Sequence, residues 1–115
     1  MTKREIAMEY FSRGYNCAQA VLLAHCEKLG LDKETALKIS APFGGGMGRL
    51  REVCGAVSGM FMVLGLKDGN VKGPEAKKAL YEKVQHLAKK YEEQYNNAPL
   101  LFSICFNFEI NSLLS

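Results

Sequence analysis

The sequence contains no tryptophan, no recognisable export signal and no apolar run long enough to cross a membrane. Its most apolar stretch, residues 53–66, is interrupted by glycine and serine and falls short of the roughly 20 residues that a bilayer requires. The polar start of the chain leads directly into an amphipathic pattern. We therefore expect a cytoplasmic protein without membrane contact, folded as a single domain over residues 1–115.

The excess of positive over negative charge is also small, since the formal net charge is only +3. Much of this excess comes from residues 77–90, where several lysines and a glutamate occur together, as is typical of a solvated helix face. So mild a basic balance argues against nucleic acid as a partner. The core must be assembled from leucine, methionine, phenylalanine, valine and alanine.

Repeated capping signals and helical spacing of apolar residues predict an all-α fold, a compact bundle of about five helices. Thr2 with Glu5 and Asn16 with Gln19 each form a capping box, and Asp32 is a third N-cap. The expected helices cover residues 2–14, 16–30, 32–42, about 50–64 and 73–95. A glycine-rich loop at residues 43–48 precedes the fourth and most apolar helix.

The last residues depart from this pattern. Apolar and polar residues alternate between Phe102 and Ile110, as in a β-strand, yet no other segment looks like a partner strand. The tail, residues 100–115, either pairs with another chain or is helical despite its pattern. We expect a homo-oligomer formed through this tail.

The four cysteines lack both the Cys-x-x-Cys and the Cys–His spacings of zinc sites, and a chain without an export signal is expected to keep its thiols reduced. Cys17 and Cys54 stand near predicted helix starts, where free N–H groups and the helix dipole stabilise a thiolate. Cys26 would lie on the opposite face of the helix from Cys17, about 13 Å along its axis. Simple packing in the core is the competing interpretation for each cysteine.

Two sets of glycines are candidates for cofactor binding. Gly44, Gly45, Gly46 and Gly48, followed by two arginines, could bind an anion or could be a flexible connector; they do not match a Walker or Rossmann motif. Gly55 and Gly59 share one helix face. Such a face admits either a closely packed helix or a cofactor.

Three segments together resemble the prokaryotic C_GCAxxG_C_C family, whose members are described as redox-active. These segments are Asn16–Val21, Gly44–Gly48 and Cys54–Gly59 followed by Met62–Leu66. The resemblance extends over about residues 3–95. It implies that Cys17 and Cys54 are the first two cysteines of the family pattern, with Cys105 near the place of the third, while Cys26 has no counterpart.

Three functions remain open at this stage. The first is a thiol redox protein that uses Cys17 and Cys54 as a pair, with an unknown redox partner. The second is a metal or iron–sulfur module with Cys17, Cys54 and Cys105 as ligands. The third is a helical interaction protein in which the cysteines only pack. Metal content separates the first two, and thiol reactivity separates both from the third.

Overall fold

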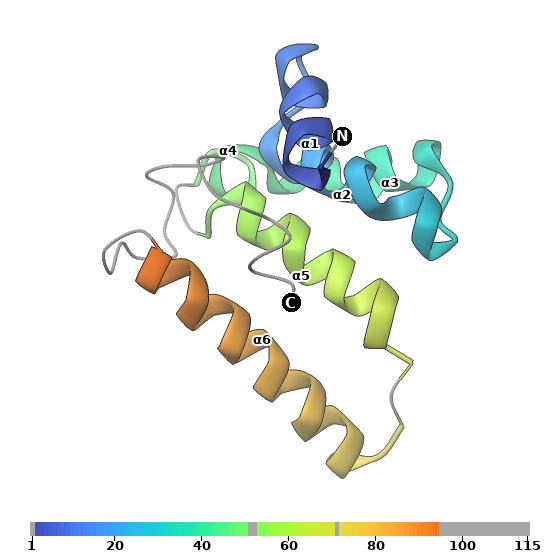
Figure 1. Cartoon of the computed structure of the whole chain (residues 1–115), viewed down its shortest axis with the longest axis vertical. Helices are drawn as coiled ribbons and strands as arrows, with labels where there is room; N and C mark the ends of the chain where they lie inside the picture. The colour runs from blue at the N-terminus through green and yellow to red at the C-terminus, as the bar shows by residue number, and fades with distance from the viewer. Residues whose placement is uncertain (1, 51–52, 71, 95–115) are drawn as a thin grey trace.

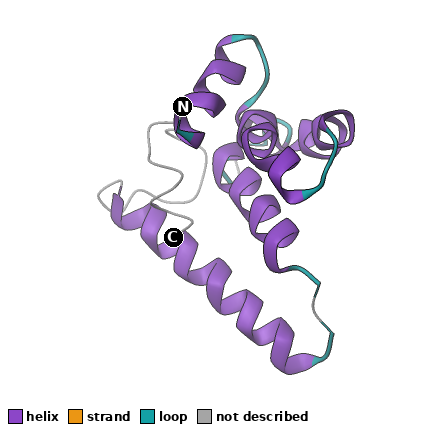
Figure 2. Ribbon diagram, turned by 45° about the vertical axis from the view of Figure 1, so that its right-hand side comes forward, coloured by secondary structure: helices purple, strands orange, loops and turns teal. Residues whose placement is uncertain are grey.

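The computed structural model describes residues 2–50, 53–70 and 72–94, and within them the chain is helical with no strand (Figures 1 and 2). Five helices have eight or more residues: α1 (Lys3–Ser12), α2 (Cys17–Cys26), α3 (Lys33–Ser40), α5 (Gly55–Asp68) and α6 (Pro74–Gln94). The shorter elements are η1 (Glu27–Leu29), η2 (Ala41–Phe43) and α4 (Gly44–Met47). The predicted all-α bundle is confirmed.

Side-chain caps place the first three helix starts where the sequence predicts them. Thr2 Oγ1 accepts a hydrogen bond from the Glu5 N–H at 3.1 Å, and the Glu5 carboxylate accepts one from the Thr2 N–H at 3.2 Å. Asp32 likewise accepts from the Thr35 N–H at 2.9 Å. These bonds satisfy N–H groups that have no partner within the helix, which is why the helices begin there.

The bounds predicted for the apolar helix are wrong at both ends. Cys54 still has a non-helical backbone, with φ −52° and ψ 133°, so α5 begins at Gly55 and not between residues 49 and 52. The helix then continues through Gly65 as far as Asp68. Glycine in a helix costs only about 1 kcal/mol, and so Gly65 does not end it.

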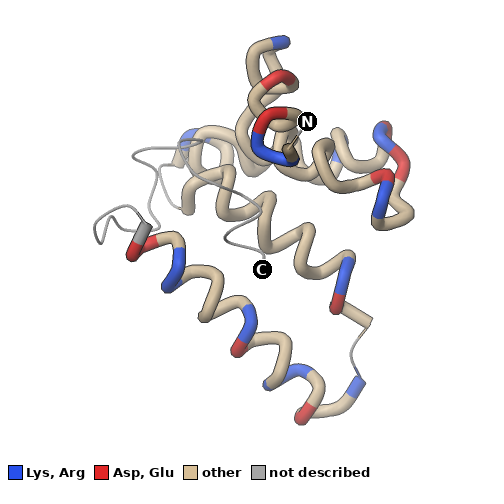
Figure 3. Tube along the Cα trace, viewed as in Figure 1, with Lys and Arg blue, Asp and Glu red and all other residues tan. Residues whose placement is uncertain are grey.

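Helix α5 is the central element, with α2 packed on one side of it and α6 alongside it on the other (Figures 1 and 2). Buried side chains from α2 and α5 supply most of the core, and α6 adds Leu87 and Tyr91. Charged residues are sparse along α5 and frequent along α6 (Figure 3). Such a distribution follows from burial, because an unpaired charge is costly to remove from water.

Two glycines allow α5 to lie directly against α2. A Cβ atom on Gly59 would stand 2.9 Å from the Val21 Cβ and 3.0 Å from the Ala18 carbonyl oxygen. A Cβ on Gly55 would be 3.2 Å from the Cys17 Cβ. A side chain at either position would have to displace α2, so the shared face of Gly55 and Gly59 lets the two helices lie close together.

The predicted role of the tail, residues 100–115, lies outside the described residues, as does Cys105. Within the described ranges, no helix is both long and apolar enough to cross a membrane.

Candidate thiol site

Cys17 occupies the first position of α2, directly after the N-cap Asn16. Its residue surface is 7 % exposed, and it lines an open pocket of about 510 Å³. The pocket is lined by Phe11, Asn16, Cys17, Ala41, Gly44, Gly45, Gly48 and Arg49. A thiol at a helix N-terminus lies close to the partial positive charge of the helix dipole, which favours the thiolate.

A hydrogen-bond network holds the start of α2 in place beneath this pocket. Asn16 Oδ1 accepts from the Gln19 N–H at 2.9 Å, and Gln19 Oε1 accepts from the Asn16 N–H at 3.1 Å. The same two side chains also donate outward, Asn16 Nδ2 to the Ala41 carbonyl and Gln19 Nε2 to the Leu37 carbonyl. The predicted capping box is therefore confirmed, and it also ties α2 to α3 and η2.

Cys54 is the residue immediately before α5, and it is fully buried. Its neighbour Gly55 is the residue whose Cβ would stand 3.2 Å from the Cys17 Cβ. The Cα atoms of Cys54 and Gly55 are about 3.8 Å apart, as in any two consecutive residues. Because Gly55 lies against Cys17, Cys54 also lies in the part of the α2–α5 interface that contains Cys17. The two cysteines predicted to form the site thus come from the starts of two packed helices.

The glycine-rich segment forms a left-handed turn on the pocket wall. Residues 45–49 all have positive φ, with values of 69°, 78°, 62°, 66° and 68°. The Gly48 N–H donates to the Gly44 carbonyl at 3.0 Å and closes the turn. Glycine adopts this backbone at no steric cost, whereas Met47 and Arg49 adopt it at about 1–2 kcal/mol each. The predicted glycine loop is therefore an ordered turn of defined handedness.

The glycines predicted to bind a cofactor lie in two places: four belong to this turn segment and two belong to the α2–α5 interface. A Cβ on Gly44 would stand 2.3 Å from the Asn16 Cγ, so Gly44 makes room for the cap of α2. Gly45 and Gly48 line the pocket, and Gly46 is buried. Gly55 and Gly59 lie within the α2–α5 interface, where they allow close packing. Cofactor binding by these glycines stays a prediction.

Phe11 and Arg49 also line the pocket, and of the two only Arg49 was indicated by the sequence. Phe11 lies on the apolar stripe of α1, yet it is 45 % exposed and forms part of the pocket wall. Arg49 is the only charged side chain among the lining residues that the structure describes. The arginine was noticeable beside the glycines, but no local pattern indicates that Phe11 turns away from the core.

Cys26 does not line this pocket and is more deeply buried than Cys17. It lies at the other end of α2, is fully buried, and its Sγ is 3.6 Å from the Leu23 carbonyl oxygen. Burial, and secondarily the negative charge of Glu27, raises the pKa of the Cys26 thiol. A higher pKa leaves less thiolate at neutral pH, which disfavours nucleophilic chemistry at this cysteine.

The described part of the chain contains no complete set of ligands for a metal ion. No three His, Cys, Asp or Glu side chains come together there in a way that could hold an ion. Structural zinc and iron–sulfur centres require four protein ligands in most cases. The third ligand predicted from the sequence, Cys105, lies outside the described residues.

These features define a small all-α protein with one recessed cysteine at the start of α2 and a second, fully buried cysteine directly before α5. The chain belongs to the C_GCAxxG_C_C family, described as "Putative redox-active protein (C_GCAxxG_C_C)", whose model matches residues 15–99. The match begins just before Cys17 and extends beyond the described end of α6. No curated protein and no solved structure matches the chain.

Proposed function

We propose that the protein is a thiol–disulfide redox protein in which Cys17 and Cys54 alternate between a dithiol and a disulfide. The observation that carries this proposal is the close approach of Gly55 to Cys17, since a Cβ on Gly55 would stand 3.2 Å from the Cys17 Cβ at the starts of α5 and α2. The description of the family as redox-active supports a redox reaction of these cysteines.

The two cysteines differ in access to solvent, and this difference assigns their roles. Cys17 lines the pocket and is slightly exposed, so it is the attacking thiol. Cys54 is fully buried and is absent from the pocket lining, so it is the resolving thiol. The N-terminus of α2 favours the thiolate form of the attacking residue.

The reaction needs a disulfide as oxidant. The Cys17 thiolate attacks one sulfur of that disulfide, which forms a mixed disulfide and releases the first thiol. The Cys54 thiolate then attacks the Cys17 sulfur, which forms the Cys17–Cys54 bond and releases the second thiol. Two electrons pass to the substrate, and its two new thiols take up the two protons lost by the cysteines. The cytoplasm suits this cycle, because its reducing pool can restore the dithiol.

Disulfide mapping tests the proposal directly. Reduced full-length protein would be treated with one equivalent of a small disulfide, trapped with acid and analysed by peptide mass spectrometry. We expect a Cys17–Cys54 bond, with both Cys26 and Cys105 recovered as thiols. Cys54→Ser should stop at the mixed disulfide on Cys17, because no second thiol is present to resolve it.

Cys26→Ser is the matched control, since it removes one buried thiol from the same helix and should leave the reaction unchanged. Equal modification of all four cysteines, or a bond that involves Cys26 in the native protein, would contradict the proposal. Cys17→Ser should abolish the fast reaction, because Cys26 and Cys54 are fully buried and do not line the pocket.

A further inference from the structure

The pocket beside Cys17 has the dimensions of a small-molecule site. Its volume of about 510 Å³ falls within the range of roughly 300–1,000 Å³ that is usual for such ligands. Cys17 is recessed, with 7 % of its surface exposed. A thin, flexible molecule can bring a sulfur atom to such a position more easily than a folded protein can.

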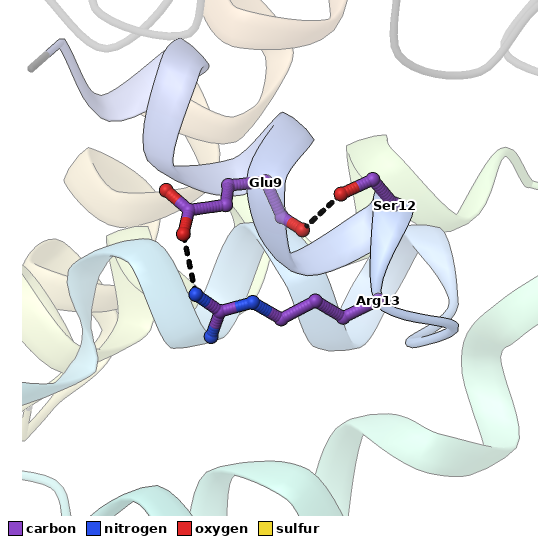
Figure 4. Close-up of polar contacts among 3 residues, drawn as sticks. All are labelled: Glu9, Ser12 and Arg13. Carbon is purple, nitrogen blue, oxygen red and sulfur yellow. Dashed lines mark hydrogen bonds and ion pairs between the residues drawn. The ribbon is translucent and has the colours of Figure 1, made fainter.

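The charge around the pocket is positive. Among the described lining residues only Arg49 is charged, and the N-terminus of α2 adds a partial positive charge at Cys17. Glu9, on the neighbouring helix α1, is engaged in an ion pair with Arg13 and is not among the lining residues (Figure 4). An anionic ligand is therefore favoured over a cationic one.

The position of Arg49 depends on the left-handed turn. Its φ is 68°, and its Cγ lies 2.9 Å from the place where a Cβ on Gly45 would stand. The absence of a side chain at Gly45 thus leaves the space that the aliphatic part of Arg49 occupies. The arginine stem lies against the glycine turn beside the pocket.

The remaining wall is suited to an aliphatic chain. Phe11 presents an exposed aromatic surface, and Ala41 and the glycines add no charge. A ligand that matches these properties has three parts: a disulfide near Cys17, a short methylene chain against Phe11 and a carboxylate near Arg49.

We propose that the substrate of the Cys17 pocket is a small carboxylate-bearing disulfide, and that Arg49 selects it through its negative charge. This inference rests on the proposed thiol–disulfide function. It adds the substrate class and one specificity-determining residue. The reaction is the one already described: the anionic disulfide gains two electrons and two protons and leaves as two thiols, while Cys17 and Cys54 become joined.

Three alkyl disulfides of similar size test the inference: 3,3′-dithiodipropionate, which is anionic, bis(2-hydroxyethyl) disulfide, which is neutral, and cystamine, which is cationic. The rate of Cys17 modification in reduced full-length protein is measured by mass spectrometry and divided by the rate of a free reference thiol with the same probe. We expect the normalised rate of the anionic probe to exceed that of the cationic probe by roughly fivefold to tenfold at low salt, and the difference to shrink as salt is added.

Arg49→Asn removes the charge while introducing a residue that tolerates a left-handed backbone. It should reduce the anionic-to-cationic ratio to about one, and leave the neutral probe nearly unaffected. Arg13→Asn is the matched control, because Arg13 pairs with Glu9 and is not a lining residue of the pocket (Figure 4). That control should keep the wild-type ratio.

The possible results separate the two proposals. If all three probes modify Cys17 with equal normalised rates, or if the cationic probe is preferred, the substrate class is wrong and the thiol–disulfide function stands. If no probe modifies Cys17 faster than Cys26, the redox proposal itself fails. Should Arg49→Asn not fold, the wild-type probe series and its salt dependence still decide the question.

Discussion

At the scale of single residues, His25 is the buried side chain with the clearest consequence for stability. It is 8 % exposed, and its Nε2 atom is buried without a hydrogen-bond partner. Burial lowers its pKa from 6.5 to about 4, helped by the positive charges of Lys3, Lys67 and Lys28. These lysines belong to α1, α5 and η1, so each neighbouring element disfavours the imidazolium form.

This lowered pKa makes stability depend on pH in the acid range. Above pH 6.5 the imidazole is neutral in both the folded and the unfolded chain. Between that value and about 4, only the unfolded chain binds the proton, so the free energy of unfolding falls as the pH is lowered. From about pH 7.5 to about pH 5, we expect a loss of about 2 kcal/mol from this residue.

Urea unfolding at the two pH values measures this loss. His25→Leu should lose less stability on acidification than the native protein, because the group that binds the extra proton in the unfolded chain is gone. His86→Leu is the matched control, since His86 is exposed on α6 and its replacement should preserve the native pH dependence. The idea is wrong if the His25 variant shows the same pH dependence as the native protein.

At the scale of elements, the α2–α5 contact determines whether the two cysteines meet. Gly59→Ala would place a Cβ 2.9 Å from the Val21 Cβ and force the helices apart. We expect a loss of about 1–3 kcal/mol in the free energy of unfolding, as for other overpacked interiors. The same displacement should slow formation of the Cys17–Cys54 disulfide.

Gly65→Ala provides the comparison within the same helix. Nothing lies within 4 Å of the Cβ position at Gly65, which is exposed. Alanine there should leave stability unchanged or raise it by up to about 1 kcal/mol, because it favours the helical backbone. Thermal or urea unfolding of both variants separates the effect of packing on stability from that of helix propensity. Similar changes in the free energy of unfolding at Gly59 and Gly65 would rule out a role for close packing.

At the scale of the whole molecule, the described helices differ in how deeply they are buried. Helices α2 and α5 contain most of the core, whereas the first half of α6 has exposed or half-buried side chains up to His86. Amide hydrogen exchange should therefore be slowest in α2 and α5 and fastest, among the long helices, in residues 74–84. Equal protection along α6 and α5 in a mass-spectrometric exchange experiment would disagree with this arrangement.

Much of the helical framework was predictable because its causes are local. A cap such as Asn16 and its partner Gln19 are three residues apart, so the sequence alone indicates where α2 begins. The same holds for the shared face of Gly55 and Gly59, which follows from the helical repeat. The predicted start of α5 was wrong, because Cys54 makes no side-chain cap and nothing local indicates that its backbone is non-helical.

The sequence by itself determined the helical class, three helix starts and the candidate pair of cysteines. Only the tertiary structure decided that Cys17 lines a pocket while Cys54 is buried, and that residues 45–49, which include Arg49, have a left-handed backbone. Helix caps and spacing depend on neighbours within one turn of the chain. Pocket walls and exposure depend on which distant segments pack together, and no local pattern encodes that packing.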